Sequence, residues 1–344
     1  MFTQSDYGRQ RPADTLSPRP FRRGADDGPR RLGDDFRARL PHDTWDVAAI
    51  PAGVRLELVS RASAVVVDLE TSGRHPLAAP TMPDAISVWR GEEFTGAVHV
   101  PVTGGETRVT LEPDGAVYTL YLPEALLARP VRLAPVDGQI DPAPLLPRWL
   151  AYGDSITQGW SATDPGRAYP ALAGRRHGLD TWNLGFAGAA RGEIAAAGHL
   201  AATEADVISL AFGTNNWSAI PTGAAHLAGI LQDFVAVIRS GHPATPIVVV
   251  SPIVRPDAEH QRNVAGATLA DLRQAIDDTT RQLASCDPAL SLVPGQELVT
   301  AEQLADGIHP GDEGHRAMAD AVGTAVAEAL AARPAAPTTE EVPA

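Results

Sequence analysis

The second half of the chain alternates short apolar runs with longer helical patterns, and this alternation is what most limits its fold. The apolar runs are RWLAYG, DTWNLG, DVISLAFG, PIVVVSP and LSLVPG. Apolar residues at three- and four-residue spacing predict helices over residues 223–240, 267–285 and 313–332. Strands that alternate with helices form a parallel sheet with helices on both faces. The sequence therefore predicts a doubly wound α/β domain over residues 148–332.

Residues 45–140 have a different pattern, with short strand-like stretches separated by Gly, Pro and Asp. In VRLELVS, for example, Val54, Leu56 and Leu58 fall on one face. Several such strands without helices between them predict a smaller, antiparallel β-sandwich of jelly-roll-like form. A proline-rich linker over residues 141–147 then joins this sandwich to the α/β domain.

The two ends of the chain are predicted to be disordered. Residues 1–44 are rich in Arg, Asp, Pro and Gly and hold few large apolar side chains. Such a composition buries too little apolar surface to offset the entropy of ordering. Residues 333–344 have the same character.

Charge and composition exclude several classes of function. The net charge is −14, which disfavours general binding to nucleic acid or to anionic membranes. The chain has no lysine, so a Schiff-base lysine, a Ser-Lys dyad and a Walker loop are excluded. Its single cysteine, Cys286, excludes an intrachain disulfide, and its place at the end of a helical pattern predicts a core position.

Targeting signals are also missing from the sequence as written. No segment approaches the roughly 18 consecutive apolar residues of a membrane span. Paired arginines near the N-terminus are followed by no apolar stretch, so neither a Sec-type nor a twin-arginine signal is recognised. A cytoplasmic protein without an integral membrane segment is expected.

Small and polar residues follow the predicted strands at the points where each strand ends. Ser155 follows the first strand, Gly188 follows the second and Asn215 follows the third, while Asp306 and His309 precede the last helix. The carboxyl ends of the strands in a doubly wound sheet lie along one edge. We therefore expect these five residues to converge there.

This set of residues has what nucleophilic catalysis requires. A serine hydroxyl is a weak nucleophile that needs a base within hydrogen-bond reach, and His309 is the candidate base. Asp306, three residues earlier, would fix the tautomer of the imidazole and stabilise its positive charge. The backbone N–H groups of Ser155 and Gly188 and the side-chain amide of Asn215 are candidate donors to an oxyanion.

The sequence resembles the SGNH hydrolases, also called GDSL esterases and lipases. The resemblance rests on four blocks in order, which are GDSITQG with Ser155, NLGFAG with Gly188, GTNN with Asn215 and DGIHP with Asp306 and His309. It covers residues 148–332 and implies a flavodoxin-like α/β fold, with these five residues as the triad and the oxyanion hole. The predicted β-sandwich over residues 45–140 is similar to the N-terminal β-rich domain of some carbohydrate O-acetyl esterases of this superfamily.

One position departs from the family pattern. The third block usually reads Gly-x-Asn-Asp, and here Asn216 stands in the Asp place. Because oxyanion binding would use Asn215, activity is expected to survive, with local loop support and substrate preference altered.

Several neighbouring residues are candidate substrate contacts, each with an alternative role. Trp160 and Trp217 would line an acyl or sugar pocket, or else pack in the core or at the rim. Arg191 would orient a polar substrate, or else pair with Glu193. The remaining candidates of this kind are Asp154 and Asn216.

No metal and no cofactor are predicted. His315 lies near Asp312 and Glu313 and could imitate a metal site. The favoured interpretation is a helix N-terminus, where acidic side chains interact well with the helix dipole. The chain has no His-Glu-x-x-His pattern and no thiolate cluster.

The predicted function is a serine ester hydrolase that releases short acyl groups, such as O-acetyl esters of a carbohydrate or a small alcohol. A longer-chain lipase or thioesterase and an acyltransferase remain alternatives with the same triad. A carbohydrate-binding protein with an inactive hydrolase domain is the alternative from another class. The expected partner is a small-molecule or carbohydrate ester, and the oligomeric state stays open.

Overall fold

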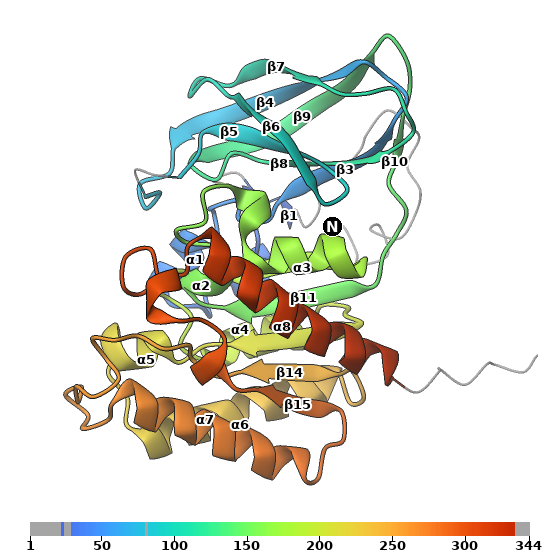
Figure 1. Ribbon diagram of the computed structural model, residues 1–344. Coiled ribbons are helices and arrows are strands. Elements are labelled where there is room, and N and C mark those ends of the chain that lie inside the picture. Colours follow the sequence, from blue (N-terminus) through green and yellow to red (C-terminus); the bar gives the residue numbers. More distant parts are fainter. Residues whose placement is uncertain (1–21, 24–28, 80–81, 334–344) are drawn as a thin grey trace, which may run out of the picture.

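The structure is a computed structural model that describes residues 22–23, 29–79 and 82–333. Figure 1 shows a β-rich lobe above an α/β lobe, with α8 (Asp312–Ala331) crossing in front of the lower sheet. The predicted class, a doubly wound parallel sheet preceded by a β-sandwich, is confirmed. The predicted tails over residues 1–21, 24–28 and 334–344 lie outside the described residues.

The β-rich lobe consists of two antiparallel sheets packed over one hydrophobic core. One sheet has the strand order β10–β3–β8–β5–β6 and the other the order β7–β4–β9. Alternate residues of β3, such as Leu56 and Leu58, point into the core between them. The strands are β3 (Arg55–Ser60), β4 (Ala64–Arg74), β5 (Ala85–Arg90), β6 (Glu93–His99), β7 (Gly105–Thr110), β8 (Val117–Tyr121), β9 (Leu126–Val136) and β10 (Ile140–Pro142).

One long strand of the sandwich, β9, lacks a regular strand pattern in the sequence. Pro130 and Pro135 interrupt its apolar pattern, and proline normally argues against a strand. The structure accommodates both prolines because β9 is an edge strand that pairs only with β4. The register of the β4–β9 pair also shifts between Asp68 and Leu69, so the sequence pattern is irregular there.

The α/β lobe is built on five parallel strands in the order β12–β11–β13–β14–β15. In chain order this is the 2-1-3-4-5 arrangement of flavodoxin-like folds, which puts the switch point beside β11. Val, Ile and Leu predominate in the central strands because both faces of a parallel sheet are buried. The strands are β11 (Arg148–Gly153), β12 (Asp180–Gly185), β13 (Val207–Ala211), β14 (Ile247–Val250) and β15 (Leu290–Val293).

Helices cover both faces of this sheet. Leu150 and Tyr152 of β11 face one core with α4, α6 and α7, whereas Trp149 and Ala151 face the other with α3 and α8. The three predicted helices correspond to α6, α7 and α8, each within two residues at both ends. The bounds are α2 (Ser155–Gln158), α3 (Tyr169–His177), α4 (Ile194–Ala201), α5 (Thr214–Ser218), α6 (Ala224–Gly241) and α7 (Leu269–Ala284).

The structure differs from the predicted disorder over residues 31–44. Leu32, Phe36 and Leu40 are buried in the same core as α4 and α6, and α1 (His42–Val47) follows them. The buried guanidinium of Arg31 donates to the carbonyls of Asn183 and Gly185 at the end of β12. This segment is poor in apolar residues, but those it has are buried against the α/β lobe.

Buried polar contacts join the sandwich to the α/β lobe. Arg55 of β3 forms an ion pair with Asp180 of β12 at 2.9 Å, and both side chains are buried. Trp89 of β5 donates to Asp164 at 3.1 Å. The phenol of Tyr121 accepts from Arg175 of α3 at 2.7 Å. Breaking one partner of such a buried pair is costly, so the two lobes are held in a defined arrangement.

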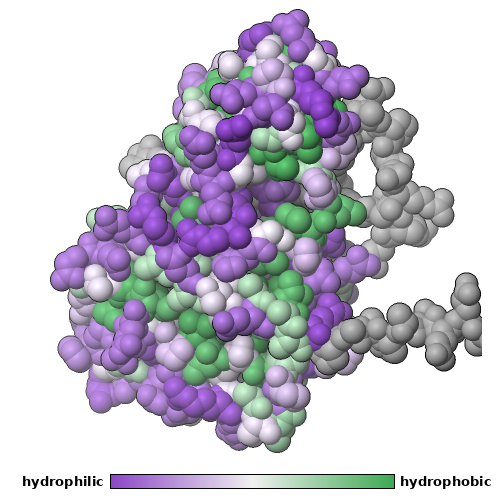
Figure 2. Space-filling model, turned by 45° about the vertical axis from the view of Figure 1, so that its right-hand side comes forward, coloured by the Kyte–Doolittle hydropathy of each residue, from purple (hydrophilic) through white to green (hydrophobic). Residues whose placement is uncertain are grey.

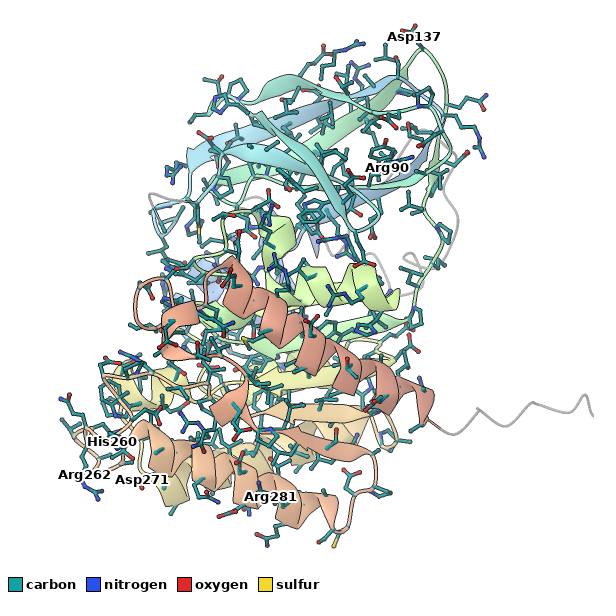
Figure 3. The ribbon with its side chains drawn as sticks, in the orientation of Figure 1. Arg90, Asp137, His260, Arg262, Asp271 and Arg281 are labelled. Carbon is teal, nitrogen blue, oxygen red and sulfur yellow. The ribbon has the colours of Figure 1, made fainter. Side chains whose placement is uncertain are left out.

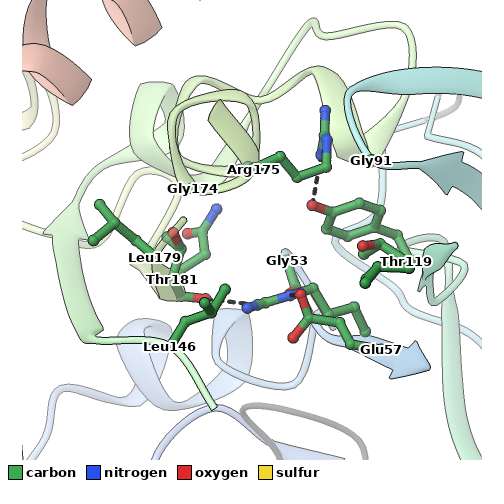
Figure 4. A pocket seen from close by; sticks show the side chains of 14 residues that line it. Gly53, Glu57, Gly91, Thr119, Leu146, Gly174, Arg175, Leu179 and Thr181 are labelled. Carbon is green, nitrogen blue, oxygen red and sulfur yellow. Dashed lines mark hydrogen bonds and ion pairs between the residues drawn. The ribbon is translucent and has the colours of Figure 1, made fainter. Parts of the chain in front are cut away.

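A cavity of about 180 Å³ lies at this junction. Figure 4 shows Glu57 and Thr119 from the sandwich on one side of it, and Arg175 and Thr181 from the α/β lobe on the other. Thr181 is near the amino end of β12, whereas Ser155 follows the carboxyl end of β11. The cavity is therefore separate from the candidate catalytic residues.

The surface mixes hydrophilic and hydrophobic residues on both lobes, as Figure 2 shows for one face. Within the described residues, no helix has both the length and the apolar character needed to cross a membrane. Cys286 is exposed, contrary to the predicted core position, because α7 ends two residues earlier at Ala284.

Glu124 is a buried carboxyl group between β8 and β9, and it makes stability depend on pH. Burial raises its pKa to about 8, although the Arg31 cation and a hydrogen bond from the Gly53 N–H act in the opposite direction. A group whose pKa is higher in the folded state stabilises the fold at low pH, and this contribution is lost as pH rises through the folded value.

We expect Glu124→Gln to melt at a higher temperature than the wild type at pH 9. The difference should shrink steadily from about pH 8 to pH 5, because the wild-type carboxyl becomes protonated in the folded state. Thermal unfolding of both proteins across this range checks it. A melting-temperature difference that is constant with pH would contradict the assignment to Glu124.

Candidate active site

Ser155, His309 and Asp306 are brought together in one hydrogen-bonded chain. The Ser155 Oγ lies 2.8 Å from His309 Nε2, and His309 Nδ1 lies 2.7 Å from Asp306 Oδ2. An ionised carboxylate only accepts hydrogen bonds, so Nδ1 carries the proton and Nε2 accepts from the serine hydroxyl. The three side chains thus stand in the order that a nucleophile, its base and an orienting acid would need.

The turn after β11 places the serine at the carboxyl edge of the sheet. Gly153 ends the strand, and a Cβ there would come within 2.1 Å of the Thr157 hydroxyl and 2.6 Å of the Ala211 carbonyl. Only glycine therefore allows β11 to pass directly into α2. Asp154 caps α2 by accepting from the Ile156 N–H at 2.9 Å, and burial raises the pKa of Asp154 to about 7. The Asp154 side chain serves this turn rather than contacting the His309 ring.

The loop before α8 holds Asp306 and His309 in register. The Leu304–Pro310 bridge closes the loop, and Asp306 Oδ1 accepts from the backbone N–H groups of Ile308 and His309. Burial acts to raise the pKa of Asp306, but the hydrogen bonds from the side chain and backbone of His309 and from Ile308 outweigh it and lower the pKa. The carboxylate is therefore ionised and can orient the imidazole.

The candidate oxyanion donors follow three neighbouring strands. Gly153 of β11 pairs with Gly185 of β12 and with Ala211 of β13, so the residues that follow these positions share one edge. Gly188 has φ 71°, a backbone conformation that glycine adopts without strain, and a Cβ there would meet nothing within 4 Å. Ser155 and Asn215 follow the other two strands.

Each candidate donor has a hydrogen to offer. Among the described residues, the N–H groups of Ser155 and Gly188 have no hydrogen-bond partner. The Asn215 Nδ2 donates one hydrogen to the Ala190 carbonyl at 3.0 Å, which leaves its second hydrogen free. Three donors at the edge of the sheet next to Ser155 are the arrangement that an oxyanion requires.

The family model for GDSL-like lipases and acylhydrolases matches residues 151–317. The match begins inside β11 and ends inside α8, so it contains all five of these residues. The chain carries a GDSL-like lipase/acylhydrolase domain. The resemblance predicted from the four sequence blocks is confirmed, and the protein is an ester-hydrolysing type of enzyme.

Solved structures share the whole two-lobed arrangement. The salicylyl-acyltransferase SsfX3 from a tetracycline biosynthetic pathway is 26% identical, with a TM-score of 0.79 over 94% of this chain and 96% of that one. A protein assigned as a GDSL-like lipase from Bacteroides ovatus is 22% identical, with a TM-score of 0.73 over 88% and 92%. A family two carbohydrate esterase from Clostridium thermocellum, in complex with cellohexaose, is 14% identical, with a TM-score of 0.62 over 81% and 92%. The last two likenesses show a shared fold alone. No curated protein matches the sequence.

The two tryptophans near the motifs of the GDSL-like domain have different surroundings. The Trp160 ring lies 5.9 Å from the His309 ring, so Trp160 forms part of the wall beside the candidate base. Trp217 donates its indole N–H to the Gln261 carbonyl at 2.9 Å, and the Arg255 guanidinium lies over its ring. Trp160 is therefore the better placed of the two to meet a substrate.

Gln261 belongs to a loop that extends along the side of the GDSL-like domain. Figure 3 shows His260 and Arg262 at the outer tip of this loop, close to Asp271 in the first turn of α7. Arg262 and Asp271 approach to 3.6 Å. Through the Gln261 carbonyl, this loop holds the Trp217 side chain in place.

His315 has a structural role in the GDSL-like domain. It is fully buried, accepts from the Tyr169 N–H and donates to the Trp160 carbonyl, both at 3.3 Å. Burial lowers the pKa of His315 to about 4, so the ring is neutral. Among the residues that the structure describes, no group of three or more His, Cys, Asp and Glu side chains could hold a metal ion.

Asn216 and Arg191 both act on the loop that carries Gly188. The Asn216 Nδ2 donates to the Arg191 carbonyl at 3.2 Å, a bond that the aspartate usual at this place in the family could not donate. The Arg191 guanidinium contacts Asp43, Glu193 and the Gly188 carbonyl. These contacts favour a role in holding the loop over the predicted contact with substrate.

We expect Asn216→Asp to destabilise the fold by about 1–3 kcal/mol, the usual cost of leaving a buried polar group without its partner. Asn216 is buried, and a carboxylate there would face the Arg191 carbonyl, acceptor against acceptor. Urea unfolding of the two proteins at pH 7 measures this difference. Equal stabilities would show that the bond from Asn216 contributes nothing.

Two residues that support the site were not predicted from the sequence. Gln158 is buried, and its Oε1 accepts from the Ala187 N–H at 3.0 Å, next to Gly188. Asp43 reaches Arg191 from α1. The place of Gln158 within the first block, GDSITQG, was the one signal that could have found it, and nothing in the sequence linked Asp43 to the site.

Proposed function

We propose that the protein is a serine ester hydrolase that forms an acyl-enzyme on Ser155 and releases short acyl groups. The observation that carries this proposal is the chain of contacts from Ser155 through His309 to Asp306, at 2.8 and 2.7 Å. In this geometry the imidazole can take the hydroxyl proton as the serine oxygen attacks a carbonyl carbon.

The reaction would run in two halves. In the first, Ser155 Oγ bonds to the ester carbonyl carbon and its proton passes to His309 Nε2. The resulting oxyanion accepts hydrogen bonds from Ser155 N–H, Gly188 N–H and Asn215 Nδ2. Collapse breaks the ester C–O bond, and His309 returns the proton to the leaving alcohol. In the second half, water gives His309 a proton as its oxygen bonds to the acyl carbon; the bond from that carbon to Ser155 Oγ then breaks, and His309 returns the proton to Ser155 as the acid leaves.

The proposed substrates are short-acyl esters, in particular O-acetyl groups on a carbohydrate or another small alcohol. Ser155 is only 7% exposed and the Trp160 ring stands beside His309, and this covered position favours a small acyl group over a long chain. The fold, sandwich included, is shared with a family two carbohydrate esterase in complex with cellohexaose. This likeness supports carbohydrate as the alcohol part of the ester.

A second candidate, acyl transfer to an acceptor alcohol, is favoured by one observation. SsfX3, which is 26% identical over 94% of this chain, is a salicylyl-acyltransferase. The same acyl-enzyme would serve, with an acceptor hydroxyl in place of water.

The experiment is to measure hydrolysis of the nitrophenyl esters of acetate, butyrate, octanoate and palmitate, with and without added sugars and small alcohols. Activity that falls steeply with chain length supports the short-acyl esterase. A peak at the long chains would replace it with a lipase or thioesterase. Formation of a new ester at the expense of free acid would establish the acyltransferase instead.

A further inference from the structure

The loop from Phe186 to Glu193 carries Gly188, and side chains from several distant elements hold it. Gln158 binds the Ala187 N–H, Asn215 binds the Ala190 carbonyl and Asn216 binds the Arg191 carbonyl. Arg191 itself turns back and donates from NH1 to the Gly188 carbonyl at 3.1 Å. The Gly188 N–H is left without a partner among the described residues.

The hydrogen bond from Arg191 to the Gly188 carbonyl affects the orientation of the Gly188 N–H. Gly188 has φ 71° and no side chain, so its backbone has alternative conformations of similar energy. The peptide group before Gly188 has its N–H free, and its orientation is set by the peptide groups on either side. Gln158 holds the peptide group on one side. On the other side the Ala189 N–H donates to the Phe186 carbonyl at 3.0 Å, and Arg191 adds the bond to the Gly188 carbonyl.

The Arg191 guanidinium is in turn fixed by Asp43. Arg191 NH1 and NH2 donate to the two oxygens of Asp43 at 2.8 and 3.2 Å, and the Arg191 side chain is only 10% exposed. Such two-pronged pairs set geometry as well as contributing energy. Asp43 lies in α1, which is anchored by Trp45 and Val47 in the core of the α/β lobe.

We propose that Asp43 is a positioning residue that acts through Arg191 to hold the Gly188 N–H toward the oxyanion. Asp43 then acts on the catalytic site from a helix whose apolar residues Trp45 and Val47 cover the core. This inference rests on the proposed function, because it requires an oxyanion at Gly188.

The test is steady-state kinetics of Asp43→Ala on nitrophenyl acetate. We expect kcat to fall about tenfold, part of the effect of losing one oxyanion donor outright, with KM changed by less than about twofold. Asp43→Glu, which keeps the charge, should recover most of the rate. Asp46→Ala is the matched control on the same helix, because Asp46 pairs with His42 and not with Arg191, and it should leave kcat unchanged.

A double-mutant cycle separates positioning from a general loss of structure. In an Arg191→Met background, Asp43→Ala should cost little more, because the path to Gly188 is already broken. Melting temperatures of Asp43→Ala and Asp46→Ala that equal the wild-type value would show that the fold is intact. Wild-type kcat in Asp43→Ala, or additive losses in the double variant, would overturn the inference while leaving a Ser155-dependent esterase in place. Activity that survives in Ser155→Ala would instead reject the proposed function itself.

Discussion

Ser155→Ala will lose turnover of nitrophenyl acetate by at least about 10⁴-fold, the usual result of removing the nucleophile of such a triad. The Ser155 Oγ is the only heavy atom removed, and its partner is His309 Nε2 at 2.8 Å. The variant should keep the wild-type melting temperature, because Gly153 and the Asp154 cap shape the turn without the hydroxyl.

A matched control removes an equivalent hydroxyl elsewhere. Ser240 is exposed at the end of α6, and its Oγ donates only to the Val237 carbonyl. Ser240→Ala should therefore retain full activity. Wild-type-like turnover from purified Ser155→Ala would reject Ser155 as the nucleophile.

Asn215→Ala will lower kcat by about 10²–10³-fold, the typical cost of removing one oxyanion donor, with a much smaller effect on KM. Asn215→Asp is the sharper test, because it keeps the size of the side chain but replaces the amide donor with a negative charge. We expect its loss to be at least as large as that of Asn215→Ala.

Asn215 also bonds the Ala190 carbonyl, so a purely structural contribution has to be separated. Ser218→Ala in the same short helix, α5, is the control, because its hydroxyl donates to the Thr214 carbonyl and faces no reacting group that we assign. A small kcat effect in both Asn215 variants would show that this amide does not face the oxyanion.

Much of the architecture of the α/β lobe could be predicted from the sequence. Both faces of a parallel sheet are buried, so its strands appear in the sequence as short continuous apolar runs. Because the strands are parallel, the residues that follow Gly153, Gly185 and Ala211 must lie along one edge of the sheet. Apolar spacing alone began the α7 helix two residues early, at 267, and the Thr268–Asp271 capping box is the local signal that marks its actual start.

The supports of the candidate site could not be predicted, because they depend on contacts between distant segments. Asp43 and Arg191 are 148 positions apart, and each taken alone is an ordinary surface charge. Residues 31–44 have too few apolar side chains to form a core of their own. Leu32 and Phe36 are buried against α4 and α6. The local composition of residues 31–44 does not reveal that these two helices offer them an apolar surface.

The central claim is that Ser155 becomes acylated, and the most direct measurement is the mass of the enzyme during turnover. Wild-type protein mixed with nitrophenyl acetate, quenched in acid and digested, should yield the peptide containing Ser155 with the added mass of one acetyl group. The same adduct should be missing from Ser155→Ala. An enzyme that turns over this ester with no acyl group on Ser155 at any time point, or with the acyl group on another residue, would contradict the account.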